Sequence, residues 1–238
     1  MTTRSGSWSL NEALENPEGE STSEADRCVL YLKKSLQTGH LLPQQRLGEE
    51  SIAQKLKMGR AAVRIAFERM VSTGLFVRLH RAGTFVRRLD IGEYRDMTEI
   101  RAILEGQAAR LAARRATDDE LRDLVAHAED IENRLARLRG KTQRNWGQIQ
   151  NLEIGFHTRV AHLSRNETLA RILASQNLIR CCFVSQRRSG PTPVRTLTHV
   201  EVAAAVASRR PVLAEKAMRD HILVSLRNQL RSLLHSDE

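Results

Sequence analysis

One carboxylate and three histidines in the C-terminal half are the side chains of this sequence best suited to binding a metal ion. Glu153 and His157 are four residues apart, so on one helix they project from the same face. His199 and His221 follow at the start and in the middle of two later predicted helices. This ligand set suits a divalent first-row metal such as zinc, nickel or manganese. The alternative is that these histidines are only packed or solvent-exposed residues.

A pair of arginines near the N-terminus indicates a different chemistry. Residues 47–70 have the pattern of two short amphipathic helices joined by a turn at Met58-Gly59, and Arg60 and Arg64 lie on one face of the second helix. A basic helix held at an angle to a smaller helix fits the major groove of DNA. Taken alone, an arginine in such a position is more often a solvated surface residue.

The charge of the chain is concentrated in the same region. The sequence has 238 residues and a formal net charge of +10. Between residues 51 and 89, Glu68 is the only acidic residue. The basic residues of that segment are Lys55, Lys57, Arg60, Arg64, Arg69, Arg78, Arg81, Arg87 and Arg88. Such a concentration is expected of an element that displaces counterions from phosphates, although a solvated basic face is the alternative.

The predicted elements place these arginines on a winged helix-turn-helix. Apolar spacing predicts helices over 23–38, 49–56 and 60–73, and alternation over 75–79 and 84–86 predicts a small β-hairpin. From residue 90 onward every element has a helical pattern, which predicts an antiparallel bundle of six or seven helices. The expected bounds are 91–115, 117–140, 144–163 and 167–188, then one helix ending at 208 and one starting at Pro211, with a loop over 189–193.

These patterns predict a mainly α protein with three parts. Residues 1–22 are polar and form a disordered or loosely docked extension, 23–89 form the DNA-binding domain, and 90–238 form a helical effector-binding and dimerisation domain. No apolar run approaches the roughly 20 residues of a membrane span, so we expect a cytoplasmic protein without a membrane partner. The three cysteines, Cys28, Cys181 and Cys182, indicate a reduced compartment, with a redox switch at the adjacent pair as the alternative.

The N-terminal segment resembles the DNA-binding domain of GntR-type bacterial regulators. The matching pieces are Leu42-Pro43, Arg46-Leu47, Ile52-Ala53, Gly59 to Arg64, Gly74-Leu75 and Arg81 to Val86. Gly59 and Ala62 replace the usual serine and proline of that pattern, and Ala82 is inserted in the wing. The resemblance implies that Arg60 and Arg64 contact bases or phosphates and that Gly83 enters the minor groove. The full set of predicted DNA contacts is Lys55, Lys57, Arg60, Arg64, Arg78, Arg81 and Gly83.

Residues 95–232 resemble the FCD effector domain of the FadR branch of that family. The resemblance lies in Glu153 to His157, Leu163 to Asn166, the surroundings of His199 and His221, and the opening helix around Arg101 to Glu105. It implies that Glu153, which stands where the family usually has aspartate, binds a metal with His157, His199 and His221. Zinc is the first candidate. Open coordination positions on the metal would then accept a small carboxylate effector. Arg101 could pair with that carboxylate. The alternative roles for Arg101 are an intramolecular ion pair and a dimer contact.

The sequence therefore predicts a homodimeric transcriptional repressor that binds a double-stranded DNA operator and responds to a small organic acid. We do not expect it to be an enzyme. One alternative is a dimeric architectural DNA-binding protein whose helical domain binds neither metal nor effector. A more remote alternative is a metal-dependent hydrolase, for which no general base or nucleophile is evident beside the four ligands.

Overall fold

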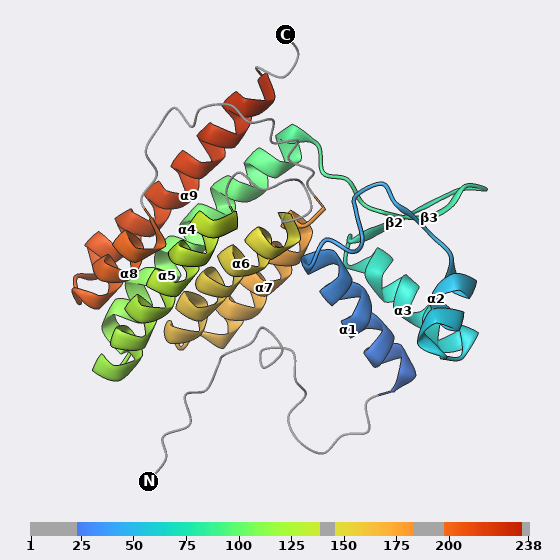
Figure 1. Ribbon diagram of the computed structural model, residues 1–238, viewed down its shortest axis with the longest axis horizontal. Helices are drawn as coiled ribbons and strands as arrows, with labels where there is room; N and C mark the ends of the chain where they lie inside the picture. The colour runs from blue at the N-terminus through green and yellow to red at the C-terminus, as the bar shows by residue number, and fades with distance from the viewer. Residues whose placement is uncertain (1–22, 139–145, 183–197, 235–238) are drawn as a thin grey trace.

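The structure of the protein is a computed structural model that describes residues 23–138, 146–182 and 198–234. A winged helix-turn-helix lies at one end of the molecule and a helical bundle at the other (Figure 1). The predicted N-terminal extension, residues 1–22, and the predicted loop at 189–193 lie outside the described residues. None of the helices in the described ranges is both long and apolar enough to span a bilayer.

Three helices form the predicted helix-turn-helix: α1 (Glu24–Gln37), α2 (Glu49–Leu56) and α3 (Arg60–Ser72). Ser23 caps α1 in a reciprocal capping box with Asp26. Lys57 ends α2 in the left-handed conformation at φ 54°, and Gly59 is the N-cap of α3 without a side-chain hydrogen bond. The buried residues of α3 are Val63, Ala66, Phe67 and Met70, so its opposite face is left for a partner.

The wing has three strands rather than the predicted two. β1 (Arg46–Leu47), β2 (Phe76–Leu79) and β3 (Gly83–Val86) form an antiparallel sheet in the order β1-β3-β2. The prediction missed β1 because two residues are too few to show alternation. Gly83 has φ +106°, and a Cβ there would lie 3.3 Å from Arg46 Nε, so a side chain at this position would be strained and crowded.

Six helices follow in the described residues, which confirms the predicted mainly α fold. They are α4 (Ile91–Arg115), α5 (Asp118–Leu138), α6 (Trp146–Leu163), α7 (Glu167–Arg180), α8 (His199–Ala207) and α9 (Pro211–Leu234). Thr117 and Glu120 form a capping box at the start of α5. The helix predicted over 167–188 ends earlier, at Arg180. The carbonyl of Cys182 instead accepts a hydrogen bond from the backbone N–H of Leu89 at 3.0 Å.

The bundle is organised around α4, which packs against α6, α7, α8 and α9, while α5 packs against α6 and α8. Gly106 allows α9 to approach α4 closely, because a Cβ at Gly106 would lie 2.6 Å from Cγ of Arg219. His221 lies two residues beyond Arg219 on α9. His221 is partly buried.

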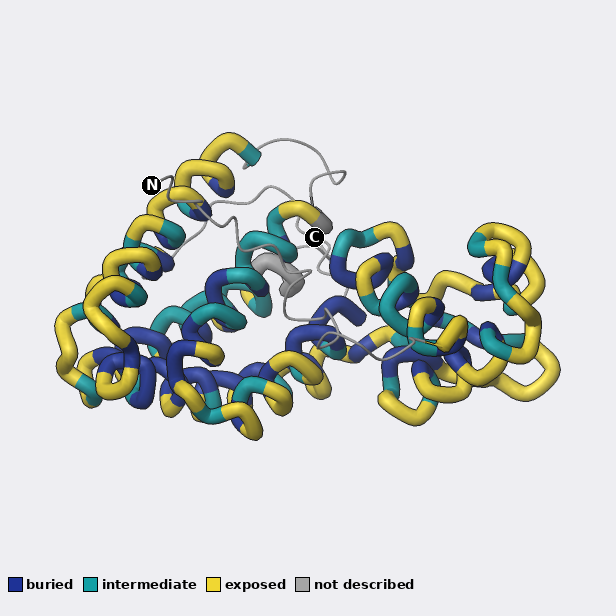
Figure 2. Tube along the Cα trace, turned by 90° about the horizontal axis from the view of Figure 1, so that it is seen from below, coloured by how far each residue is buried: buried dark blue, intermediate teal, exposed yellow. Residues whose placement is uncertain are grey.

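The buried residues form two apolar clusters along the facing sides of the helices (Figure 2). One cluster lies inside the bundle. The other begins beneath α3 and continues into the helical domain through Ile154, Leu178, Cys182 and Leu226, so the two domains share a core. Burial raises the pKa of the Cys181 thiol to about 11 and that of Cys182 to about 12, and both are free. Protonated, buried thiols disfavour the redox switch considered above.

Candidate functional site

The three predicted histidines come together in the middle of the helical bundle. His157 lies on α6, His199 is the first residue of α8, and His221 lies on α9. Each offers one ring nitrogen, and these three nitrogens all lie within 4.8 Å of one another. The ring centroids are 4.9 to 5.8 Å apart. His157 and His199 are each only 4% exposed, whereas His221 is partly buried.

Glu153 is not part of this group. Among the described histidine, cysteine, aspartate and glutamate residues, the metal-ligand group at this place contains the three histidines alone. Glu153 lies one turn before His157 on α6 and is partly buried. Burial lowers the pKa of Arg101, Glu105 outweighs it and raises that pKa, and Glu153 adds a smaller effect in the same direction as Glu105.

Two carboxylates that the sequence did not assign approach the histidines. Glu105 on α4 contacts Nδ1 of His157 through Oε2, and its Oε1 accepts a hydrogen bond from Nε of Arg101 at 2.5 Å. The side chains of Arg101, Glu105 and His157 are all 4% exposed or less. The spacing of Arg101 and Glu105, four residues apart on one helix, was the signal that could have identified this pair.

Glu132 on α5 holds His199 at two points. Its Oε1 is 2.7 Å from Nδ1 of the His199 ring and accepts the backbone N–H of the same residue at 3.0 Å. The other ring nitrogen, Nε2, is buried without a hydrogen-bond partner among the described residues. Glu132 follows the buried Ile131 on α5 and lies at the edge of the apolar face of that helix. This position was the one sequence feature that indicated contact with the interior of the bundle.

Burial and the nearby Arg101 determine the protonation states of Glu105 and His157. Burial alone would raise the pKa of Glu105, but Arg101 and His157 outweigh it and hold that pKa well below its usual range. Burial lowers the pKa of His157 to about 3, despite the opposing effect of Glu105. At neutral pH the site therefore combines an ionised Glu105, a protonated Arg101 and a neutral His157.

The residues present fit a divalent metal ion. Neutral imidazoles are the form that binds metal, and Nε2 of His199 is buried with no hydrogen-bond partner in the described part of the chain. Tetrahedral zinc holds two nitrogens about 3.4 Å apart, so ring rotations of modest size could close the group. Two carboxylates contact the histidines directly, Glu105 at His157 and Glu132 at His199, and negative charge beside the imidazoles favours a cation.

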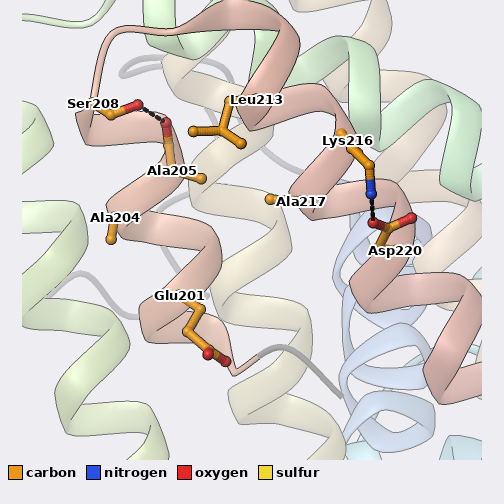
Figure 3. A pocket seen from close by; sticks show the side chains of 8 residues that line it. All are labelled: Glu201, Ala204, Ala205, Ser208, Leu213, Lys216, Ala217 and Asp220. Atoms are coloured by element: carbon orange, nitrogen blue, oxygen red, sulfur yellow. Dashed lines mark hydrogen bonds and ion pairs between the residues drawn. The ribbon is translucent and has the colours of Figure 1, made fainter. Parts of the chain in front are cut away.

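Arg101, the predicted effector residue, is engaged in the buried ion pair with Glu105, the intramolecular role considered among its alternatives. A separate surface groove of about 520 Å³ lies between α8 and α9 (Figure 3). Its lining includes Glu201, Leu213 and an ion pair between Lys216 and Asp220, but none of the three histidines. This groove is therefore distinct from the histidine cluster.

On the N-terminal domain, the two predicted arginines of α3 are exposed. The side chains of Arg60 and Arg64 are 79% and 71% exposed. Arg60 pairs with Glu50 at 2.7 Å, and Arg64 lies 3.7 Å from Glu49. Glu49 also contacts Arg78 of the wing at 3.5 Å. Exposed pairs of this kind contribute little free energy, so the arginines can exchange these partners for phosphates.

The remaining predicted DNA contacts surround this helix. Lys57 is exposed at the end of α2, and Arg81 is exposed at the tip of the wing beside Gly83. Lys55 is also exposed, but its ammonium lies 5.6 Å from the ring centroid of Tyr31 on α1. Arg46, which extends over Gly83, is an exposed cation of the wing that the sequence prediction omitted.

Comparison with known proteins supports both halves of this architecture. Residues 24–86 match the family described as bacterial regulatory proteins of the gntR family, and residues 96–223 match the FCD domain. The Nta operon transcriptional regulator of Aminobacter aminovorans is 33% identical over 139 residues, which cover 57% of this chain and 61% of that protein. The Glc operon transcriptional activator of Escherichia coli strain K12 is 25% identical over 220 residues, 84% of each chain.

A solved GntR-type regulator from Rhodococcus sp. RHA1 has the same fold, with a TM-score of 0.68 and 20% identity over 88% of this chain and 99% of that one. The family matches exclude the hydrolase alternative, because the family and the relatives are transcription regulators. The chain therefore belongs to the GntR family of bacterial regulatory proteins and is a transcriptional regulator with an FCD domain behind its DNA-binding domain.

Proposed function

We propose that this regulator is a cytoplasmic homodimeric repressor that releases its operator when a small carboxylate binds in the helical domain beside a divalent metal ion. The observation that carries the metal part is the convergence of His157, His199 and His221. One nitrogen of His199 is also buried without a hydrogen-bond partner among the residues that the structure describes. The FCD match supports a small-molecule effector. A dimer would present two α3 helices to a symmetric operator, about one turn of DNA apart.

The three histidines would hold the metal, and Glu153 one turn away on α6 is the carboxylate that could join them after a side-chain movement. When bound, a divalent ion supplies positive charge and open positions for a carboxylate ligand. Arg101 would add a guanidinium to the same region, but only an anion that competes with Glu105 could reach it, because the two side chains are paired and buried.

The shared core supplies a route from this site to the DNA-binding domain. Ile154 lies three residues before His157 on α6 and belongs to the cluster that includes Phe67 and Met70 of α3. The Cys182 carbonyl at the end of α7 also accepts the Leu89 N–H from the segment that follows the wing. A shift of α6 on effector binding would therefore change the packing beneath α3, which is the coupling that release of DNA requires.

For DNA binding, we expect Arg64→Ala to weaken binding of a fragment from the gene's own upstream region by about 1–3 kcal/mol, because an exposed arginine of α3 would contact a base. Fluorescence anisotropy measures this affinity. Arg69→Ala is the matched control on the same helix, since Arg69 donates to Asp26 of α1 at 2.5 Å and points away from the free face. Equal affinities for wild type and Arg64→Ala would remove Arg64 from the contact set.

For the metal, we expect purified wild-type protein to retain a divalent ion, and His157→Ala and His221→Ala to lose it, because each removes one of the three clustered nitrogens. Elemental analysis after gel filtration measures the metal content. His162→Ala, an exposed histidine on the same helix as His157, should retain the wild-type content. The architectural alternative would be supported instead if the wild-type protein held no metal and if short-chain carboxylic acids left its affinity for DNA unchanged.

A further inference from the structure

We propose that Glu132 is the positioning residue of the histidine cluster, holding the His199 ring so that Nε2 is its metal-binding atom. The inference rests on the proposed metal site and deepens it. A single carboxylate oxygen of Glu132 lies within hydrogen-bond distance of both the His199 backbone nitrogen and its ring Nδ1, at 3.0 and 2.7 Å.

The geometry determines which nitrogen of His199 carries the hydrogen. A neutral imidazole has one N–H, and a carboxylate can only accept, so the nitrogen beside Glu132 must be the donor. Nδ1 therefore carries the hydrogen and Nε2 carries the lone pair. That Nε2 is the buried atom without a hydrogen-bond partner in the described structure, so the lone pair is presented to the cluster rather than satisfied by the protein.

The backbone contact fixes the ring in space as well as its tautomer. His199 is the first residue of α8, and Glu132 comes from α5, on which α8 packs. Because Glu132 accepts the His199 backbone N–H, it also anchors the start of α8. Thr198 and Glu201 cap that start independently through their own reciprocal hydrogen bonds. Loss of Glu132 should therefore leave α8 formed while freeing the ring to rotate and change tautomer.

Glu105 contacts His157 in a comparable way, but it gives no clean test. Its removal would leave the buried Arg101 without its partner, so instability would obscure any change at the metal. The side chain of Glu132 is 19% exposed, and its contacts to His199 tie it directly to the cluster. Substitution of Glu132 is therefore the more specific probe of how carboxylates position the imidazoles.

The test compares wild type with Glu132→Gln and Glu132→Ala in the full-length protein, with Glu129→Ala, an exposed carboxylate on the same helix, as control. Zinc affinity is measured by competition with a chromophoric chelator. We expect Glu132→Ala to bind zinc about 10- to 100-fold more weakly, Glu132→Gln to fall between it and wild type, and Glu129→Ala to match wild type. Glutamine keeps an acceptor oxygen but lacks the charge that strengthens the imidazole as a ligand.

A second measurement separates positioning from mere structural support. Long-range ¹H–¹⁵N spectra of the metal-free protein report the tautomer of His199, assigned by comparison with His199→Gln. We expect the Nδ1–H form in wild type and a mixture of both tautomers in Glu132→Ala. An Nε2–H form in wild type would overturn the inference, as would the wild-type tautomer persisting in Glu132→Ala.

The zinc titration distinguishes failure of this inference from failure of the proposed function. If wild type and Glu132→Ala bind zinc equally well, the role of Glu132 is rejected while the histidine site stands. If wild type takes up no zinc, the metal site is rejected and the role of Glu132 towards it falls too. Circular dichroism of each variant confirms that a lower affinity does not come from loss of helix.

Discussion

Arg101→Met should lower the free energy of unfolding by about 3–5 kcal/mol at neutral pH, the cost of leaving one charge of a buried ion pair without its partner. The side chains of Arg101 and Glu105 are 4% and 2% exposed, and the guanidinium is what keeps Glu105 ionised despite its burial. Methionine fills much of the same volume, so the loss comes from the charge rather than from a cavity. Urea denaturation of the chelator-treated protein, followed by circular dichroism, measures it.

A matched exposed pair provides the control. Arg134 and Asp130 on α5 have the same four-residue separation, but their side chains are 57% and 60% exposed. Arg134→Ala should therefore cost less than about 1 kcal/mol. The double variant Arg101→Met with Glu105→Gln should recover much of the lost stability, because no uncompensated charge stays buried. If Arg101→Met lowered the free energy of unfolding no more than Arg134→Ala does, Glu105 would not depend on Arg101 to stay ionised.

The comparison between sequence and structure shows which features local patterns can predict. The helices, their caps at Ser23 and Thr117, and the wing follow from apolar periodicity and from residues that favour helix ends, so they were predictable. Strand β1 was not, because its two residues acquire an extended conformation only by pairing with β3. The end of α7 at Arg180 also differs from the predicted 188, and the Cys182 carbonyl just beyond it accepts the backbone N–H of Leu89, a contact between distant parts of the sequence.

The site shows the same division between local and distant information. The three histidines could be named from their residue type and from resemblance, and the structure brings them together. Their carboxylate partners could not, because Glu132 and His199 are 67 positions apart and meet only through packing of α5 on α8. Glu153 shares the face of α6 that carries His157, but the clustered nitrogens are those of the three histidines alone among the described residues, so its role as a ligand stays a prediction.

Charge counting had a similar limit in the DNA-binding domain. The excess of basic residues between 51 and 89 is real, but Glu49 and Glu50 lie just before that segment and contact Arg60, Arg64 and Arg78 in the folded protein. These carboxylates therefore partly neutralise the exposed arginines until phosphates replace them as partners. The net charge of a sequence window describes the DNA-binding surface only after the neighbours of each cation are known.

The histidine cluster should also make the metal-free protein sensitive to acid. The pKa of His157 is about 3 in the folded state and about 6.5 for an exposed histidine, so between these values the unfolded chain binds a proton that the folded chain does not. Stability is therefore lost as the pH falls from about 6.5 towards 3, by about 1.4 kcal/mol per pH unit from this residue. Glu105, whose pKa is also lowered, adds a loss in the same direction at still lower pH.

His157→Gln removes this proton uptake, so its free energy of unfolding should depend less steeply on pH. Urea denaturation with chelator at several values between pH 6.5 and 4.5 should give a slope shallower than wild type by about 1.4 kcal/mol per pH unit, whatever its stability at pH 7. His162→Gln, at an exposed site on the same helix, should keep the wild-type slope. Parallel curves for wild type and His157→Gln would mean that His157 takes up its proton equally in the folded and the unfolded protein. That result would remove the lowered pKa derived for His157 in the folded state.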